Sequence, residues 1–150
     1  MEFLEFYNCC KVTFAANDSL PVPTEEQAAK LFELTERMLD VNKKMNLTAI
    51  TEPGAVILKH YADSMMISRF LPENSTVIDV GCGAGFPSLP IAILRSDVRV
   101  TSLDSTTKKI DFINRTAEEL SLKNIIAISS RAEDFAKENR ERFDVATSRA

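Results

Sequence analysis

The sequence predicts an α/β fold, in which N-terminal helices precede a parallel sheet made of alternating strands and helices. Two features predict it. Up to residue 72 the apolar residues recur mainly at helical spacing, whereas from Thr76 short β-branched or aliphatic runs alternate with amphipathic segments. Strands that alternate with helices form right-handed βαβ units with parallel strands. We therefore expect a helical segment over residues 1–72, packed on a sheet domain over residues 73–150.

The helical part contains two main segments. Thr24–Gln27 has the form of a capping box, which predicts a helix start, and apolar residues then recur at helical spacing to about Lys44. The pair Pro53-Gly54 interrupts the chain. A second apolar helix is expected over about residues 55–70, ending before Pro72.

The second half carries the strand signals. Ser105 is expected to cap a helix between the second and third strands. Four strands are expected, whereas doubly wound sheets commonly have about six, so we expect a sheet that is incomplete at the C-terminus, as in a piece of a longer protein. The expected strands are Val77–Val80, Val98–Leu103, Ile125–Ile128 and Phe143–Thr147, and a further aliphatic run, Ile91–Arg95, lies between the first two.

The composition limits the class of protein. With 150 residues, 45% of them apolar, the chain has the size of one globular domain. Its apolar runs fall short of the roughly 18 residues that a membrane span needs. The first residues carry Glu2 and Glu5 where a signal peptide would be basic, so we expect a cytoplasmic protein with no membrane partner. A net charge of -4 argues against nonspecific coating of nucleic acid.

Metal-binding residues are scarce. His60 is the only histidine, and the three cysteines are the adjacent Cys9 and Cys10 and the isolated Cys82. This pattern has neither a CxxC pair nor a zinc spacing. We expect no metal site, and few groups that could transfer protons near neutral pH.

Three of the four glycines lie within Val77–Pro90, VIDVGCGAGFPSLP, at Gly81, Gly83 and Gly85. A glycine turn between a strand and its helix lets a ligand approach the backbone, because a Cβ would clash. Dinucleotide enzymes use G-x-G-x-x-G, and this spacing is one residue tighter. Asp79 would repel a pyrophosphate but attract an amino group and a sulfonium. The sequence therefore favours S-adenosylmethionine over NAD, with Asp79 and these glycines as cofactor-binding residues.

Further candidate ligands follow the next two strands. Asp104 ends the second strand, where an acidic side chain can accept hydrogen bonds from both ribose hydroxyls, and Ser105 follows it. After the third strand, the Ala132 amide and the Glu133 side chain are placed to read the adenine edge. A Rossmann-type nucleotide-dependent oxidoreductase remains the alternative on fold grounds.

With these residues assembled, the chain resembles the small-subunit ribosomal RNA methyltransferase G family, also called glucose-inhibited division protein B. The resemblance runs from about Thr24 to Ala150. Its most specific parts are Asn46-Leu47-Thr48, His60 with Asp63-Ser64, the run Asp79 to Pro90 with Gly85-Phe86-Pro87, Asp104-Ser105, Ala132-Glu133 and Ser148-Arg149-Ala150.

The resemblance implies a class I S-adenosylmethionine-dependent methyltransferase fold with a Rossmann-like sheet. It implies methyl transfer to N7 of a guanine in 16S rRNA of the small ribosomal subunit. It also implies that Asp104 binds the cofactor ribose and that the other cofactor contacts are Gly81, Phe86, Ala132, Glu133 and Arg149. Because the family's proteins continue beyond Ser148-Arg149-Ala150, a cofactor-binding fragment without catalysis is a second alternative.

Attack by guanine N7 needs no general base, because N7 carries a lone pair and no proton. The protein must instead align the nucleophile, the methyl group and the sulfur. Arginine often binds both O6 and N7 of guanine, yet N7 must stay free here. Arg149 is therefore expected to be a positioning residue, which either orients the cofactor or binds O6 alone.

Two groups of polar residues have less defined roles. His60, Asp63 and Ser64 share one helix face without an oxyanion site, so we expect them to pack the helical segment on the cofactor domain or to line the substrate entrance, not to form a hydrolase triad. Asn46 is expected to end a helix, and Thr48 to make a local turn bond. The candidate RNA contacts are Lys43, Lys44, Lys108, Lys109, Arg115 and Lys123.

Overall fold

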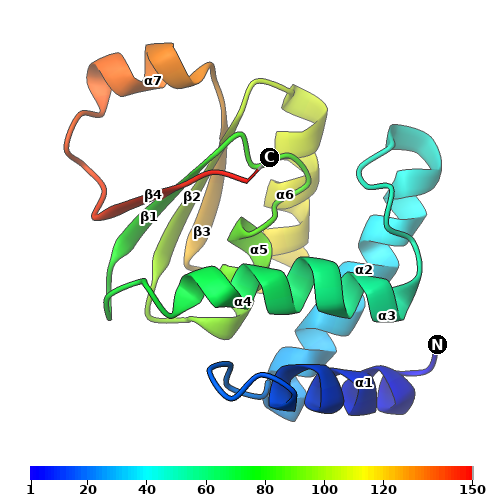
Figure 1. Cartoon of the computed structure of the whole chain (residues 1–150). Helices are drawn as coiled ribbons and strands as arrows, with labels where there is room; N and C mark the ends of the chain where they lie inside the picture. Colours follow the sequence, from blue (N-terminus) through cyan, green and yellow to red (C-terminus); the bar gives the residue numbers. More distant parts are fainter. Residues whose placement is uncertain (150) are drawn as a thin grey trace.

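The computed structural model describes residues 1–149, so Ala150 of the Ser148-Arg149-Ala150 motif lies outside the described residues. The chain forms helices first and then alternates strands with helices (Figure 1). The elements are α1 (Phe3–Ala15), α2 (Glu25–Met45), α3 (Pro53–Val56), the π-helix η1 (Ile57–Ala62), α4 (Asp63–Ser68), β1 (Thr76–Val80), α5 (Ser88–Leu94), β2 (Arg99–Asp104), α6 (Thr107–Glu119), β3 (Ile125–Ser129), α7 (Ala132–Glu138) and β4 (Val145–Thr147).

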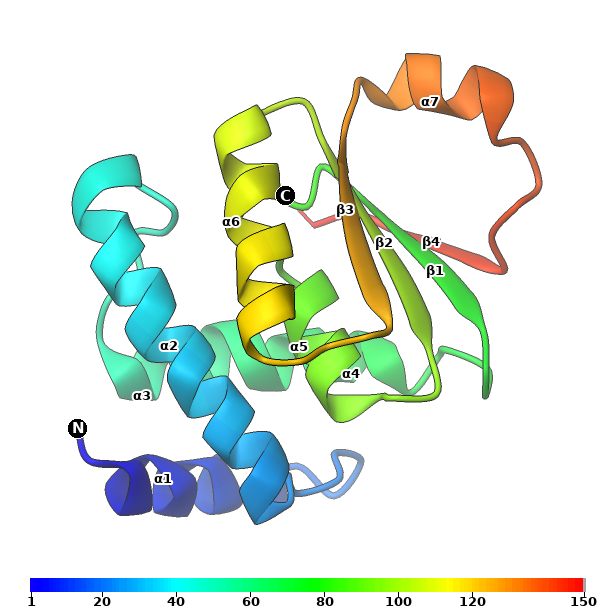
Figure 2. The ribbon, with the colours of Figure 1, turned by 180° about the vertical axis from the view of Figure 1, so that it is seen from behind.

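The sheet is parallel, with the strand order β3-β2-β1-β4. The chain moves in one direction across the sheet from β1 to β3 and then returns to the other side of β1. Right-handed crossovers therefore place α5 and α6 on one face and α7 on the other, as Figures 1 and 2 show. In this register Asp79 lies opposite Ser102 and Thr147. The predicted α/β class is confirmed.

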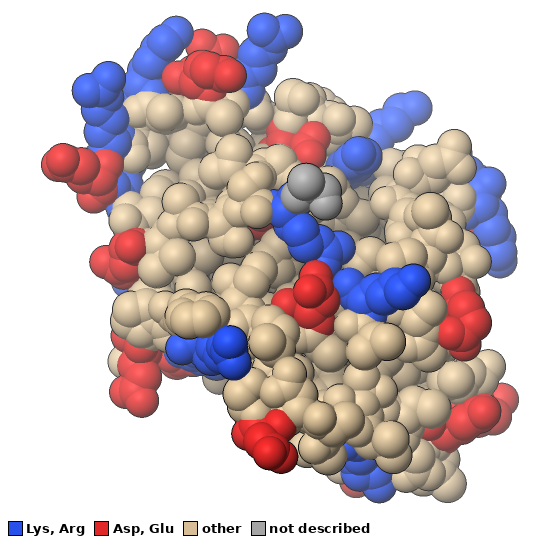
Figure 3. Space-filling view, in the orientation of Figure 1, with Lys and Arg blue, Asp and Glu red and all other residues tan. Residues whose placement is uncertain are grey.

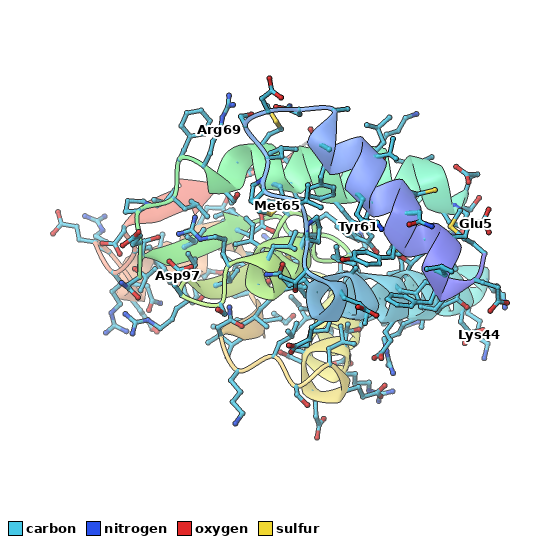
Figure 4. All side chains as sticks on the ribbon, turned by 90° about the horizontal axis from the view of Figure 1, so that it is seen from below. Glu5, Lys44, Tyr61, Met65, Arg69 and Asp97 are labelled. Atoms are coloured by element: carbon cyan, nitrogen blue, oxygen red, sulfur yellow. The ribbon has the colours of Figure 1, made fainter. Side chains whose placement is uncertain are left out.

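The N-terminal helices pack against the sheet domain through α5, which contacts both α2 and α4. Their interior is apolar and aromatic, with Phe6, Leu31, Tyr61 and Met65 at most 1% exposed. Figure 4 shows Tyr61 and Met65 toward the middle of the molecule and Lys44 at its margin. These residues belong to the same buried cluster as the apolar residues of the sheet, such as Val77. The division of the chain at residue 72 stays a prediction.

Two of the helix predictions are confirmed. Thr24 Oγ1 accepts from the Gln27 amide at 3.2 Å and Gln27 Oε1 accepts from the Thr24 amide at 2.9 Å, which is the capping box that starts α2. Asn46 ends this helix in the left-handed region, with φ 47°. The second predicted helix runs from Pro53 to Ser68, but its centre is the π-helix η1, which the periodicity does not reveal.

One sequence interpretation differs from the structure, and two elements were not specified by the sequence pattern. Ser105 is not the cap of α6, because the helix begins at Thr107 after Thr106 and no side chain caps its first turn. The aliphatic run Ile91–Arg95 lies mostly in helix α5, where it is buried on the sheet. Helix α1 was not indicated by the pattern, although it buries Phe6 and other residues. Within residues 1–149, no helix has both the length and the apolar character needed to cross a membrane.

Candidate functional site

A pocket of about 470 Å³ opens at the carboxyl ends of β1, β2 and β3. This is the edge of a parallel sheet at which α/β proteins bind ligands, and the volume lies within the usual range of roughly 300–1,000 Å³. Five of the ten predicted cofactor-binding residues line it. The lining residues are Val80, Gly81, Leu103, Asp104, Ser105, Ser130, Arg131, Ala132 and Glu133.

The glycine turn opens onto this pocket at Gly81. Its φ is 70°, a left-handed conformation that favours glycine, and a Cβ placed there would have no atom within 4 Å. The Gly81 amide donates to the Leu103 carbonyl at 2.8 Å, which ties the turn to the end of β2. Gly81 is thus fixed in position while the space beside it stays open for a ligand.

Gly85 has a different role in the same turn. Its φ is 94°, and a Cβ placed there would lie 2.7 Å from Leu89 Cδ1 and 3.2 Å from Ile113 Cγ1. The missing side chain therefore allows α5 and α6 to pack closely on the turn. Gly85 does not line the pocket, and neither does Gly83.

Asp104 is held by two backbone amides. Its Oδ2 accepts from the Gly83 amide at 3.0 Å, and its Oδ1 accepts from the Thr106 amide at 2.8 Å. Partial burial raises the pKa of Asp104, but the hydrogen bonds from Thr106 and Gly83 outweigh it and lower the pKa below its ordinary value. The carboxylate is therefore ionised and oriented, and each oxygen retains a lone pair for a ligand hydroxyl.

Asp79, one residue before the end of β1, is 1% exposed and does not line the pocket. Ser88 Oγ donates to its Oδ2, while its Oδ1 has no hydrogen-bond partner. Burial is the main cause that raises the pKa of Asp79 to about 6, against the Ser88 hydrogen bonds and the nearby Arg149 charge. A buried carboxylate oxygen without a partner is costly, so a cationic ligand group there would stabilise it.

Arg149 and Phe86 join the N-terminal helices instead of lining the pocket. Arg149 Nη1 donates to Asp63 Oδ2 at 3.0 Å, and its Nη2 lies 3.0 Å from His60 Nδ1. The His60 ring stacks on Phe86, with the ring centroids 4.3 Å apart. The expectation that His60 and Asp63 pack the helices on the sheet domain agrees with these contacts.

A hydrolase triad is excluded by the placement of Ser64. Its hydroxyl donates to the backbone carbonyl of His60, and it makes no hydrogen bond with the imidazole. Both imidazole nitrogens are engaged elsewhere, one by Arg149 and the other by Thr48 Oγ1 at 3.0 Å. In residues 1–149 no group of three His, Cys, Asp or Glu side chains is arranged to hold a metal ion.

Sequence reasoning missed three residues of this region. Ser88, the partner of Asp79, lies within the glycine-rich run but carries no signal apart from its position in the first turn of α5. Arg131 and Ser130 line the pocket beside Ala132, and their position after β3 is the only signal for them.

Comparisons with known proteins agree with the motifs. The family model described as "rRNA small subunit methyltransferase G" matches residues 27–150. The protein named ribosomal RNA small subunit methyltransferase G of Clostridium botulinum (strain Eklund 17B) is 45% identical over 152 residues, which cover 98% of this chain and 62% of that protein. Its namesake in Clostridium perfringens (strain SM101) is 49% identical over 140 residues, 90% of this chain and 59% of that protein.

The chain therefore spans about three fifths of the length of these relatives. Among solved structures, precorrin-6Y C5,15-methyltransferase of Geobacter metallireducens is 16% identical with a TM-score of 0.49, over 58% of this chain and 46% of that chain. The oxidoreductase alternative gains no support from the matched family. By the extent of the family match and the identity to its relatives, this chain belongs to the rRNA small subunit methyltransferase G family.

Proposed function

We propose that the chain carries the cofactor site of an S-adenosylmethionine-dependent methyltransferase that acts on N7 of a guanine in 16S rRNA. The single observation that carries this proposal is the pair of carboxylates at the glycine turn. Asp104 is ionised and oriented at the pocket, and Asp79 has a buried oxygen without a partner. The family supplies the reaction, since its relatives are named ribosomal RNA methyltransferases.

The residues fit the parts of this cofactor. Asp104 would bind the ribose hydroxyls, and Ala132 and Glu133, which line the same pocket, would bind the adenine. The unpartnered Oδ1 of Asp79 would pair with the amino group of the methionyl part. When bound, S-adenosylmethionine supplies an electrophilic methyl group on a positively charged sulfur. Like Asp79, three of the other predicted residues do not line the pocket: Gly83, Gly85 and Phe86. They would act on the cofactor only through the conformation of the glycine turn.

The chain's own part in catalysis is positioning. Guanine N7 gives up no proton during attack, so no side chain has to act as a base. His60 agrees with this, because burial, followed by the Arg149 charge, lowers its pKa to about 4 and leaves it neutral at physiological pH. Arg149, beyond the end of β4, would orient the cofactor or bind guanine O6, so that the nucleophile and the methyl group are aligned.

The RNA substrate is proposed to be bound as part of the folded small ribosomal subunit in the cytoplasm. On the face in Figure 3, Lys and Arg are interspersed with Asp and Glu instead of forming one broad basic area. Some basic residues are paired, such as Lys43 with Asp40 at 3.1 Å. This face therefore lacks the broad basic area with which proteins commonly bind free single strands. A ribosomal particle should accordingly be methylated faster than a naked transcript.

Two measurements, made one after the other, test the proposal. Calorimetry of the 150-residue chain with S-adenosylhomocysteine should show saturable binding, and NADH should give none. Binding of NADH alone would overturn the cofactor assignment. Transfer of tritiated methyl to small ribosomal subunits, followed by mapping of the base, then compares this chain with a longer protein of the family. Methylation only by the longer protein would mark this chain as a cofactor-binding fragment, and a modified base other than guanine would overturn the acceptor.

A further inference from the structure

One line of hydrogen bonds joins the loop after α2 to the end of β4 through His60. Thr48 Oγ1 lies 3.0 Å from His60 Nε2, and His60 Nδ1 lies 3.0 Å from Arg149 Nη2. His60 is 5% exposed, on the π-helical turn η1. π-helical turns interrupt α-helices and are common at functional sites. The only imidazole of the chain is thus buried between a hydroxyl and a guanidinium.

The protonation of this imidazole follows from its neighbours. A guanidinium has only donors and stays charged, so Arg149 must donate to Nδ1, and Nδ1 carries no proton. The proton of the neutral ring then resides on Nε2 and is donated to Thr48 Oγ1. This oxygen also accepts from the Ile50 amide at 3.0 Å, so both of its lone pairs are used. One tautomer satisfies every contact.

The imidazole is held firmly on its other sides. Its ring stacks on Phe86, with an interplanar angle of 14°. Thr48 is clamped by Asn42, whose Oδ1 accepts from the Thr48 amide at 2.9 Å and whose Nδ2 donates to the Thr48 carbonyl at 3.0 Å. A side chain held by packing and by a clamped partner can hold a third group in place. That third group is the Arg149 guanidinium.

The orientation of the Arg149 side chain determines whether it can pair with Asp79. Arg149 follows Thr147 by two residues, and Thr147 lies opposite Asp79 in the sheet. Yet Arg149 pairs with Asp63 on the helical side, and among residues 1–149 no ion pair within 4.0 Å joins it to Asp79. Asp79 Oδ1 is left without a partner. An arginine free to turn toward this buried oxygen would compete with a ligand's ammonium group for it.

We propose that His60 is a positioning residue: as the neutral Nε2-protonated tautomer it holds Arg149 on the helical side and keeps Asp79 available to the cofactor. The assignment rests on the proposed cofactor site. On this proposal, the Thr48 loop and η1 together orient Arg149, which lies 89 residues from His60 in the sequence. His60 does not line the pocket.

The tautomer can be read directly, because the chain has one histidine. In the chain labelled with ¹⁵N-histidine, a long-range ¹H–¹⁵N spectrum should show Nε2 in the protonated range and Nδ1 in the unprotonated range at neutral pH. An imidazolium, a proton on Nδ1 or rapid tautomer exchange would overturn the proposal. This measurement needs neither cofactor nor activity.

Two variants test the effect on the ligand. His60→Phe keeps a ring on Phe86 but removes the acceptor, and it should weaken S-adenosylhomocysteine binding by about tenfold, the scale of one hydrogen bond to a charged group. His60→Asn retains an acceptor near the position of Nδ1 and should restore most of the affinity. In an Arg149→Met background, His60→Phe should have no further effect, because the group it positions is absent.

The outcomes separate this inference from the function on which it rests. A wild-type chain that binds no S-adenosylhomocysteine would overturn the cofactor site and, with it, the assignment to His60. A wild-type chain that binds, with a folded Phe variant that binds equally well, would overturn only the role of His60. An equal loss from His60→Phe with and without Arg149 would mark His60 as merely structural, and so would a failure of Asn to rescue binding.

Discussion

Gly83 and Asp104 are joined across the candidate site, since the Gly83 amide donates to Asp104 Oδ2 at 3.0 Å. The turn after β1 is therefore held by the acid that ends β2. The same carboxylate accepts from the Thr106 amide, which orients it before any ligand arrives. Cofactor binding would then need little rearrangement, which favours affinity.

Asp104→Asn should weaken S-adenosylhomocysteine binding by at least about tenfold, the scale of one hydrogen bond to a charged group. The amide has nearly the same shape, but its NH₂ must face either the Gly83 or the Thr106 amide, and two donors cannot pair. Calorimetry measures the affinity. Asp111→Asn, at an exposed position of α6, is the matched control and should bind normally. Equal affinities for the two variants would refute the ribose role of Asp104.

Alanine substitutions at two glycines of the turn should differ in their effects on stability and on ligand binding. Gly85→Ala would bring a Cβ to 2.7 Å from Leu89 Cδ1 at a φ of 94°, and it should destabilise the chain by about 1–3 kcal/mol or more. Gly81→Ala meets no atom within 4 Å and should cost only about 1–2 kcal/mol of backbone strain. Thermal unfolding measures both losses.

The same two variants differ in their effect on the ligand. Because Gly81 lines the pocket, its alanine variant should lose more affinity for S-adenosylhomocysteine than its stability loss suggests. Folded Gly85→Ala protein, measured below its unfolding temperature, should bind nearly as the wild type does. The reverse order of affinities would show that Gly85, not Gly81, borders the ligand.

Local signals in the sequence were sufficient for much of the fold. The capping box at Thr24 and the alternation of strands and helices depend on neighbouring residues, and they predicted α2 and the parallel sheet. The secondary structure of Ile91–Arg95 could not be assigned from the sequence, because a short buried apolar run has the same pattern in a strand as in a helix. The cap of α6 was placed one residue early, at Ser105 instead of Thr106.

The part of the site that lies at the carboxyl ends of the strands was predictable from the sequence. Gly81 follows β1, Asp104 ends β2 and Glu133 lies in the helix that follows β3, so their meeting at one edge of the parallel sheet follows from the topology. The contact between Arg149 and His60 does not, because it depends on how the N-terminal helices dock on the sheet domain and on a π-helical turn. No local pattern indicates either feature.

Ligand affinity should rise with pH through about 6, the pKa to which burial raises Asp79 in the free chain. A cationic amino group beside Asp79 favours the ionised carboxylate, so binding near this pH should release protons. The release makes the calorimetric enthalpy depend on the ionisation enthalpy of the buffer. Asp79→Asn should lose this buffer dependence and bind more weakly. A buffer-independent enthalpy for the wild type at pH 6 would separate Asp79 from the ligand.

The stability of the chain should also report the neutral state of His60. Burial, followed by the Arg149 charge, lowers its pKa to about 4, against the opposing charge of Asp63 and an ordinary value near 6.5. Between these two values the unfolded chain binds more protons at this position than the folded chain does, so the contribution of His60 to stability is complete above about pH 6.5 and declines as the pH falls toward 4. Asp79, with its raised pKa, acts in the opposite direction over an overlapping range, so the curve of the wild type alone is ambiguous.

Comparison with His60→Asn removes this ambiguity, because Asp79 is present in both proteins and the variant has no imidazole. Urea unfolding at several pH values should show the wild type losing free energy of unfolding relative to the variant as the pH is lowered from about 7 to 4. Since the chain has no other histidine, no second imidazole can produce this difference. Parallel curves for the two proteins would mean that His60 gains its proton as easily in the folded chain as in the unfolded one, and that its contact with Arg149 does not hold it neutral.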